Sequence, residues 1–166
     1  MIILWVIVAV ILLFGFVVLF GAPYVPTLNS ELTQAFTKLY PVGKQDVVVD
    51  LGSGDGRVLA AAVSRGATAY GYELNPLLVV FTKLRLGRRA NVQLRDMWTV
   101  ALPADTTLVY VFTVSRDGRR LGRFLQSQVN KRGRALSVMT FGPTLKGYTP
   151  VSTHRGHSLY ELHPSK

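Results

Sequence analysis

The amino-acid sequence predicts an α/β fold: a mostly parallel sheet with an antiparallel C-terminal edge, preceded by one transmembrane helix. Three observations predict it. Residues 1–22 form an uncharged apolar run. From residue 46 onward, short apolar runs alternate with helical patterns, which is typical of a parallel sheet covered by helices on both faces. The last apolar segment, residues 158–163, follows no clear helix, so we expect an antiparallel edge there.

The N-terminal run is long enough for a membrane span. About 20 apolar residues in a helix cross the hydrocarbon core, where only a helix satisfies its own backbone hydrogen bonds. A cleaved signal peptide would begin with Lys or Arg, be shorter, and end in a small-residue cleavage site; Phe20-Gly21-Ala22 is a poor one. A run that is apolar on every face also does not suit a surface helix. We therefore expect residues 1–22 to be a membrane anchor.

The charges all follow this run, and they favour one orientation. The chain has 19 Lys and Arg residues and a net charge of +10, and its first charged residue is Glu31. The positive-inside rule then predicts a single-pass membrane protein with its domain on the cytoplasmic side. The basic surface is either simply solvated or in contact with anionic lipid, and nucleic acid is the less favoured partner. The absence of cysteine excludes disulfides and cysteine-ligated zinc.

The chain divides into an anchor helix over 1–22, a linker and N-terminal helix over 23–45, and a domain over 46–166. Pro23 and Pro26 prevent the first helix from continuing, and Pro41 ends the second. The expected strands are 46–51, 67–72, 91–95, 107–113, 134–141 and 158–163, the last one paired with 145–149. The expected helices are 57–64, 76–89 and 115–132.

A glycine-rich loop follows the first strand and reads Asp50-Leu51-Gly52-Ser53-Gly54-Asp55-Gly56. It is not a dinucleotide fingerprint, because Arg57 stands where the third glycine would be, and no P-loop Gly-Lys-Ser/Thr follows. Glycines let the backbone approach a bulky ligand, and amides at the next helix can bind its carboxylate. Asp50 is placed to face an ammonium group of the same ligand.

Carboxylates also end the next two strands. Glu73 is placed to accept hydrogen bonds from ribose hydroxyls, and Asp96 from an adenine amino group, with the Met97 amide as a donor beside it. Ligands of such sheets bind at the carboxyl ends of the strands, where these residues would meet. The predicted ligand-binding residues are Asp50, Gly52, Ser53, Gly54, Glu73, Leu74, Asp96 and Met97.

This pattern resembles the class I, seven-strand S-adenosylmethionine-dependent methyltransferases, which have a Rossmann-like sheet. More narrowly, PYVPT at 23–27, DLGSGDGR at 50–57 and GYELNP at 71–76 are similar to a group of small membrane-anchored methyltransferases. The group includes the mitochondrial lysine methyltransferases of the adenine nucleotide translocase and of the ATP synthase c-ring protein. The resemblance extends to about residue 100. It implies S-adenosyl-L-methionine as the cofactor and lysine of a membrane-associated protein as the acceptor.

A lysine acceptor must lose a proton from a group with a pKa of about 10.4, which an apolar aromatic pocket favours. Tyr110, Phe112 and Trp98 lie near the appropriate strand ends, and Tyr24 and Thr27 are placed to close such a pocket. Ordinary core packing is the alternative for each aromatic residue.

Other acceptors remain open from the sequence. Residues 111–115 lack the Asn-Pro-Pro-Tyr type of motif, which counts against nucleobase methylation. The alternatives are a small apolar membrane substrate, such as a lipid or quinone, and a membrane module that binds the donor without catalysis. His154 and His157 have no further ligand nearby, so we expect loop residues there and no metal site.

Overall fold

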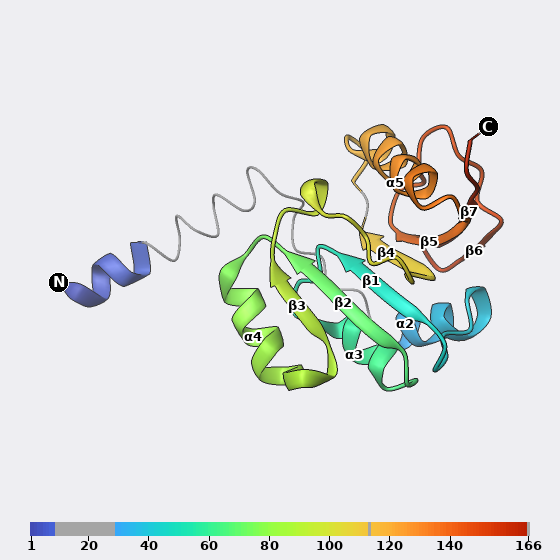
Figure 1. Ribbon diagram of the computed structural model, residues 1–166. Helices are drawn as coiled ribbons and strands as arrows, with labels where there is room; N and C mark the ends of the chain where they lie inside the picture. The colour runs from blue at the N-terminus through green and yellow to red at the C-terminus, as the bar shows by residue number, and fades with distance from the viewer. Residues whose placement is uncertain (9–28, 113, 166) are drawn as a thin grey trace.

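The computed structural model describes residues 1–8, 29–112 and 114–165. Its centre is a seven-stranded sheet in the order β3-β2-β1-β4-β5-β7-β6 (Figure 1). The strands are β1 (Val47–Leu51), β2 (Thr68–Glu73), β3 (Asn91–Leu94), β4 (Leu108–Phe112), β5 (Leu136–Phe141), β6 (Ser152–His154) and β7 (His157–Leu162).

The first five strands are parallel and the last two form an antiparallel edge, as predicted. From β1 the chain builds outward through β2 to β3, then returns to place β4 on the other side of β1. The carboxyl ends of β1 and β4 therefore meet where the strand order reverses, which is where ligands of such sheets bind.

The predicted partner of the last strand is wrong. Strand β7 pairs with β6, whereas residues 145–149 form no strand. The loop is fixed instead by a side chain, because the fully buried Leu145 donates its N–H to the hydroxyl of Tyr160 at 3.0 Å.

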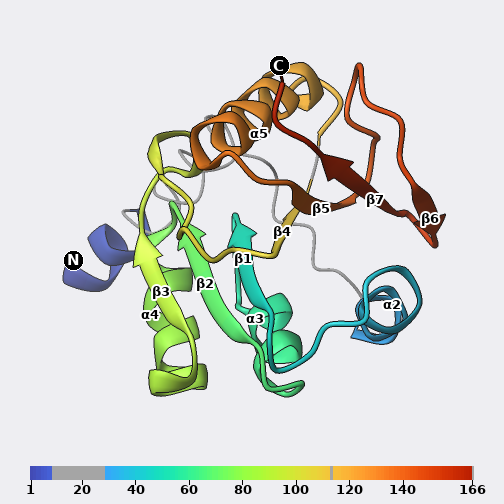
Figure 2. The same ribbon diagram turned by 45° about the vertical axis from the view of Figure 1, so that its right-hand side comes forward.

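Helices cover both faces of the sheet (Figure 2). They are α2 (Asn29–Gln34), which continues as the π-helix η1 (Ala35–Leu39), then α3 (Arg57–Val63), α4 (Pro76–Leu86) and α5 (Gly118–Arg132), with the short 3-10 turns η2 (Gly87–Arg89) and η3 (Met97–Thr99). One hydrophobic cluster joins α2, α3 and α4 to one face of the sheet, and a second joins α5 to the other.

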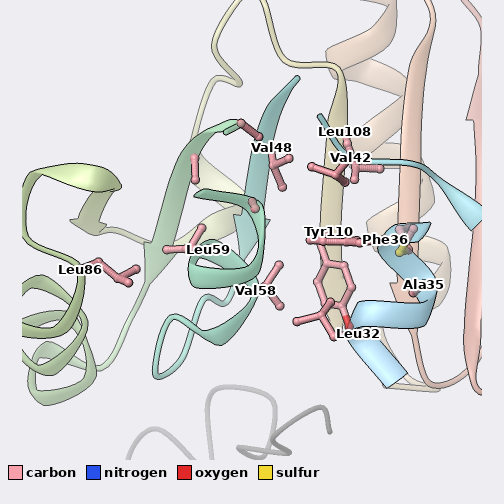
Figure 3. Packing of buried hydrophobic residues seen from close by; sticks show 14 of the residues in the cluster. Leu32, Ala35, Phe36, Val42, Val48, Val58, Leu59, Leu86, Leu108 and Tyr110 are labelled. Carbon is pink, nitrogen blue, oxygen red and sulfur yellow. The ribbon is translucent and has the colours of Figure 1, made fainter. Parts of the chain in front are cut away.

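The core follows from strand alternation. Val48 and Leu108 face the cluster with α2 and α3, shown in Figure 3, whereas Val49 and Val109 face α5. The N-terminal helix belongs to this packing, since Leu32 and Phe36 are each 1% exposed. Where the domain boundaries at residues 22 and 45 lie stays a prediction.

The predicted transmembrane helix is a correction to the fold class. Among the described residues, none of the helices is long and apolar enough to cross a membrane. The described part of the segment is a helix over residues 2–8, which rises only about 10 Å, against a hydrocarbon core of about 30 Å. Residues 9–22 of the predicted anchor lie outside the described residues.

Candidate functional site

The glycine loop leaves the carboxyl end of β1 and is tied at once to β2. The N–H groups of Gly52 and Ser53 both donate to the carbonyl of Tyr72, at 2.9 and 3.1 Å. Gly52 has φ +89°, a conformation that disfavours any side chain, and a Cβ there would meet no described atom within 4 Å. The loop therefore presents bare backbone beside open space.

Asp50 ends β1 as a buried carboxylate, 3% exposed. Among the residues that the structure describes, no N–H or O–H group donates to it. Burial first, and then the charges of Glu73 and Asp55, raise the pKa of Asp50 well above its usual value. A cationic group bound beside the glycine loop would relieve this unfavourable arrangement.

Glu73 joins the end of β2 to the same loop. Its Oε2 accepts from the Gly54 N–H at 2.8 Å, and its Oε1 accepts from the N–H groups of Leu74 and Asn75 at 2.9 and 2.8 Å. Asn75 then caps α4 by accepting from Leu77 N–H. An ionised carboxylate has about four acceptor positions, so Glu73 retains capacity for a ligand hydroxyl.

Asp96 ends the third strand and begins η3. Its Oδ1 accepts from the Trp98 N–H at 3.0 Å, so the carboxylate caps this turn. The Trp98 ring lies under the guanidinium of Arg120 at 4.0 Å and edge-on to Phe124 at 5.9 Å. Met97 is partly buried in the same cluster against α5.

One element of the loop was not predicted as functional. Asp55 forms a 2.7 Å ion pair with Arg57 and lies 3.7 Å from Arg85 of α4. Burial alone would raise the pKa of Asp55, but hydrogen bonds and charge from Arg57, with Arg85, lower it overall. Thr82 of α4 also donates to the Gly54 carbonyl at 3.0 Å. The acidic residue inside the glycine loop was the available signal for this link to α4.

The aromatic residues predicted for an acceptor pocket are not all together. The ring of Tyr110 is buried against Phe36, as Figure 3 shows, and its hydroxyl lies 3.0 Å from Nε2 of His157. Phe112 is partly exposed at the end of β4. Trp98 belongs to the cluster on the opposite face of the sheet. Tyr24 and Thr27 lie outside the described residues.

The expectation that His157 is a loop residue is wrong. It begins β7 and is 1% exposed. The apolar alternation of the last strand starts one residue earlier than predicted, so His157 points into the core with Leu159.

A surface hollow lies elsewhere, lined by Lys83, Gly87, Arg88, Ala90, Asn91 and Val92. It is at the amino end of β3, whereas the carboxylates gather at the carboxyl ends of the strands. The chemistry therefore points to the glycine loop and not to this hollow.

The fold is shared with solved structures. An RNA methyltransferase from Salinibacter ruber, determined with S-adenosyl-L-homocysteine, superposes with a TM-score of 0.74 at 24% identity, over 86% of this chain and 95% of that one. An S-adenosylmethionine-dependent O-methyltransferase from Thermotoga maritima gives 0.63 at 12% identity, over 93% and 72% of the two chains. The chain therefore has the seven-strand, Rossmann-like fold of S-adenosylmethionine-dependent methyltransferases.

Sequence relatives narrow the group. The chain is 32% identical over 120 residues to the lysine N-methyltransferase of the ATP synthase c-ring protein from Xenopus laevis, covering 69% of this chain and 52% of the relative. It is 36% identical over 121 residues to the adenine nucleotide translocase lysine N-methyltransferase of Mus musculus, with shares of 69% and 52%. No protein-family profile matches the chain.

These matches identify the chain as a homologue of the two lysine N-methyltransferases, the same group that its sequence motifs predicted. It spans about half the length of the curated relatives it matches.

Proposed function

We propose that this chain binds S-adenosyl-L-methionine at the glycine loop and methylates a lysine side chain of a protein. The observation that carries the proposal is Asp50, a buried carboxylate without a donor among the described residues, directly before a loop of bare backbone. Such a site suits a ligand that brings its own positive charge. The names of the homologues support protein lysine as the acceptor.

Each residue of the site has a separate part in holding the donor. Asp50 attracts the ammonium group, and backbone amides of the loop suit the carboxylate. Glu73 is already fixed by three backbone amides, so it is positioned to accept from the ribose. Asp96 and the Met97 amide are at the edge where adenine would lie. When bound, the donor supplies a methyl group already activated by its sulfonium.

The chain must therefore mainly align a neutral amine with that methyl group, since proximity and orientation supply most of the acceleration. A lysine is protonated in water near pH 7, with a pKa of about 10.4. Apolar surroundings at the acceptor side favour the neutral amine, which is the nucleophile. Protein side chains thus act by binding, by excluding water and by orientation.

The test has a binding stage and a transfer stage. Calorimetry with S-adenosyl-L-homocysteine should show binding to the wild type, about 10-fold or more weaker for Glu73→Gln and unchanged for the exposed Glu161→Gln. Radiolabelled donor should then label lysine in the purified c-ring protein of ATP synthase or in the adenine nucleotide translocase. Label in the lipid extract instead would favour a small apolar substrate. Binding without any transfer would favour a non-catalytic module, and no binding would refute the proposal.

A further inference from the structure

Three aromatic side chains form a row across the carboxyl edge of the sheet. Phe112 of β4 pairs with Phe141 of β5, and Phe141 pairs with His157 of β7. The rings of Phe112 and Phe141 are 6.1 Å apart, and those of Phe141 and His157 are 4.8 Å apart. Since paired residues of neighbouring strands point to the same face, the three rings form one surface. We call these three residues the aromatic row.

The aromatic row begins beside the glycine loop. Asp50 pairs with Tyr110 and Leu51 with Val111, so Phe112 starts where the loop starts. Side chains two residues apart on a strand share a face, which places Phe112 on the same face as Tyr110 and Asp50. The carboxylate assigned to the donor and the aromatic row therefore lie on one face, at one edge of the sheet.

The far end of the row is held rigidly. His157 is 1% exposed, and its Nε2 lies 3.0 Å from the hydroxyl of Tyr110. The Tyr110 ring in turn meets Phe36 edge-on at 6.1 Å. The His157 ring lies against Phe141 at an interplanar angle of 35°. The position of Phe141 is thus set by a buried hydrogen-bonded pair.

The row also carries no positive charge at neutral pH. Burial lowers the pKa of His157 below 6.5, against the opposing effects of the backbone at Arg155 and His154 and of the Glu31 charge, with the His154 charge adding to the decrease. A neutral imidazole does not repel an approaching lysine side chain. Apolar rings disfavour its protonated form by desolvation, and ring faces attract the methylammonium product.

We propose that Phe112 and Phe141 form the binding wall for the acceptor amine, and that the His157–Tyr110 pair positions Phe141. This inference rests on the proposed function and adds residues to it. In the transfer, the lone pair of the neutral lysine nitrogen forms the new N–C bond while the S–C bond breaks and leaves its electron pair on sulfur. The positive charge passes to the methylated nitrogen, which then releases a proton to solvent.

The test separates acceptor binding from donor binding. Phe112→Leu and Phe141→Leu should each raise KM for the purified c-ring protein of ATP synthase, or for the adenine nucleotide translocase if that is the labelled protein, by about 10-fold. The Kd for S-adenosyl-L-homocysteine should stay within about twofold. Phe81→Leu is the matched control, because Phe81 is 52% exposed on α4, and it should change neither value.

The positioning role has its own readout. Tyr110→Phe keeps the ring but removes the hydrogen bond to His157, and should raise the acceptor KM about threefold with little change in kcat. A merely structural loss of folded protein would lower the apparent kcat at unchanged KM.

The two proposals can fail separately. A wild type that labels no protein lysine refutes the proposed function. A wild type that transfers methyl groups, together with Leu variants of unchanged acceptor KM, refutes the aromatic row as the binding wall. If a Leu variant does not fold, Phe141→Tyr places a hydroxyl on the wall. A higher acceptor KM for that variant then supports the inference, and an unchanged KM overturns it.

Discussion

Asp50 shows how a single residue trades stability for binding. Its folded-state pKa is raised above the unfolded value of 3.8, so the folded state binds more protons in the range between the two values. Stability therefore falls as pH rises through that range, and the loss is complete at pH 7 if the raised pKa lies below it. Asp50→Asn removes this charge, and we expect a higher melting temperature at pH 7 but not at pH 3, with donor affinity reduced at least 10-fold.

The exposed Asp105 provides the control for this prediction. Asp105→Asn should leave the melting temperature within about 1–2 °C of the wild type, corresponding to less than about 0.5 kcal/mol. A destabilised Asp50→Asn at pH 7 would mean that the carboxylate has a donor in the protein, and the assigned site would lose its main support.

His157 gives the opposite pH dependence. Because burial lowers its folded-state pKa below 6.5, the unfolded chain binds the proton more readily. Stability is fully present above pH 6.5 and is lost as pH falls from there toward the folded-state pKa. In urea unfolding, the wild type should lose more free energy of unfolding between pH 7.5 and 5.5 than His157→Gln does. The exposed His163→Gln should retain the wild-type slope, and a flattened slope there would assign the effect elsewhere.

At the scale of elements, the glycine loop and α4 are fitted to each other. Gly56 has φ +76°, and a Cβ there would collide with the Thr82 side chain, which also bonds the loop at the Gly54 carbonyl. Gly133, at the C-terminus of α5, has φ +65° but open space around it. Gly133→Ala should therefore lower stability by about 1 kcal/mol, from backbone conformation alone.

Gly56→Ala combines this backbone effect with the collision, so it should lower stability by about 2–4 kcal/mol and weaken donor binding as well. Chemical denaturation of both variants, with calorimetry against S-adenosyl-L-homocysteine, measures the difference. Equal losses of stability in the two variants would show that α4 yields to the loop, and that the contact does not fix the site.

For the whole molecule, the sequence predicted those parts that depend on local pattern. Buried strands such as β1 and β4 are unbroken apolar runs, and the DLGSGDGR loop states its backbone requirement in its glycines. Strand β6 could not be predicted, because Ser152–His154 has no apolar pattern and pairs with β7 through its backbone. The link from Asp55 to Arg85, and the Tyr110–His157 pair, join residues distant in sequence that only the folded sheet brings together.

The last prediction concerns coupling between the site and global stability. A ligand that binds only the folded state stabilises it by mass action, by about 2.7 kcal/mol at 100 times its Kd. For a chain of this length, each kcal/mol raises the melting temperature by about 2–4 °C, so saturating S-adenosyl-L-homocysteine should raise it by about 5–10 °C. Asp50→Asn should abolish most of this rise while melting higher than the wild type without ligand. Phe141→Leu should retain the full rise, because the aromatic row is assigned to the acceptor. A rise lost equally in both variants would mean that the two halves of the site are not separate.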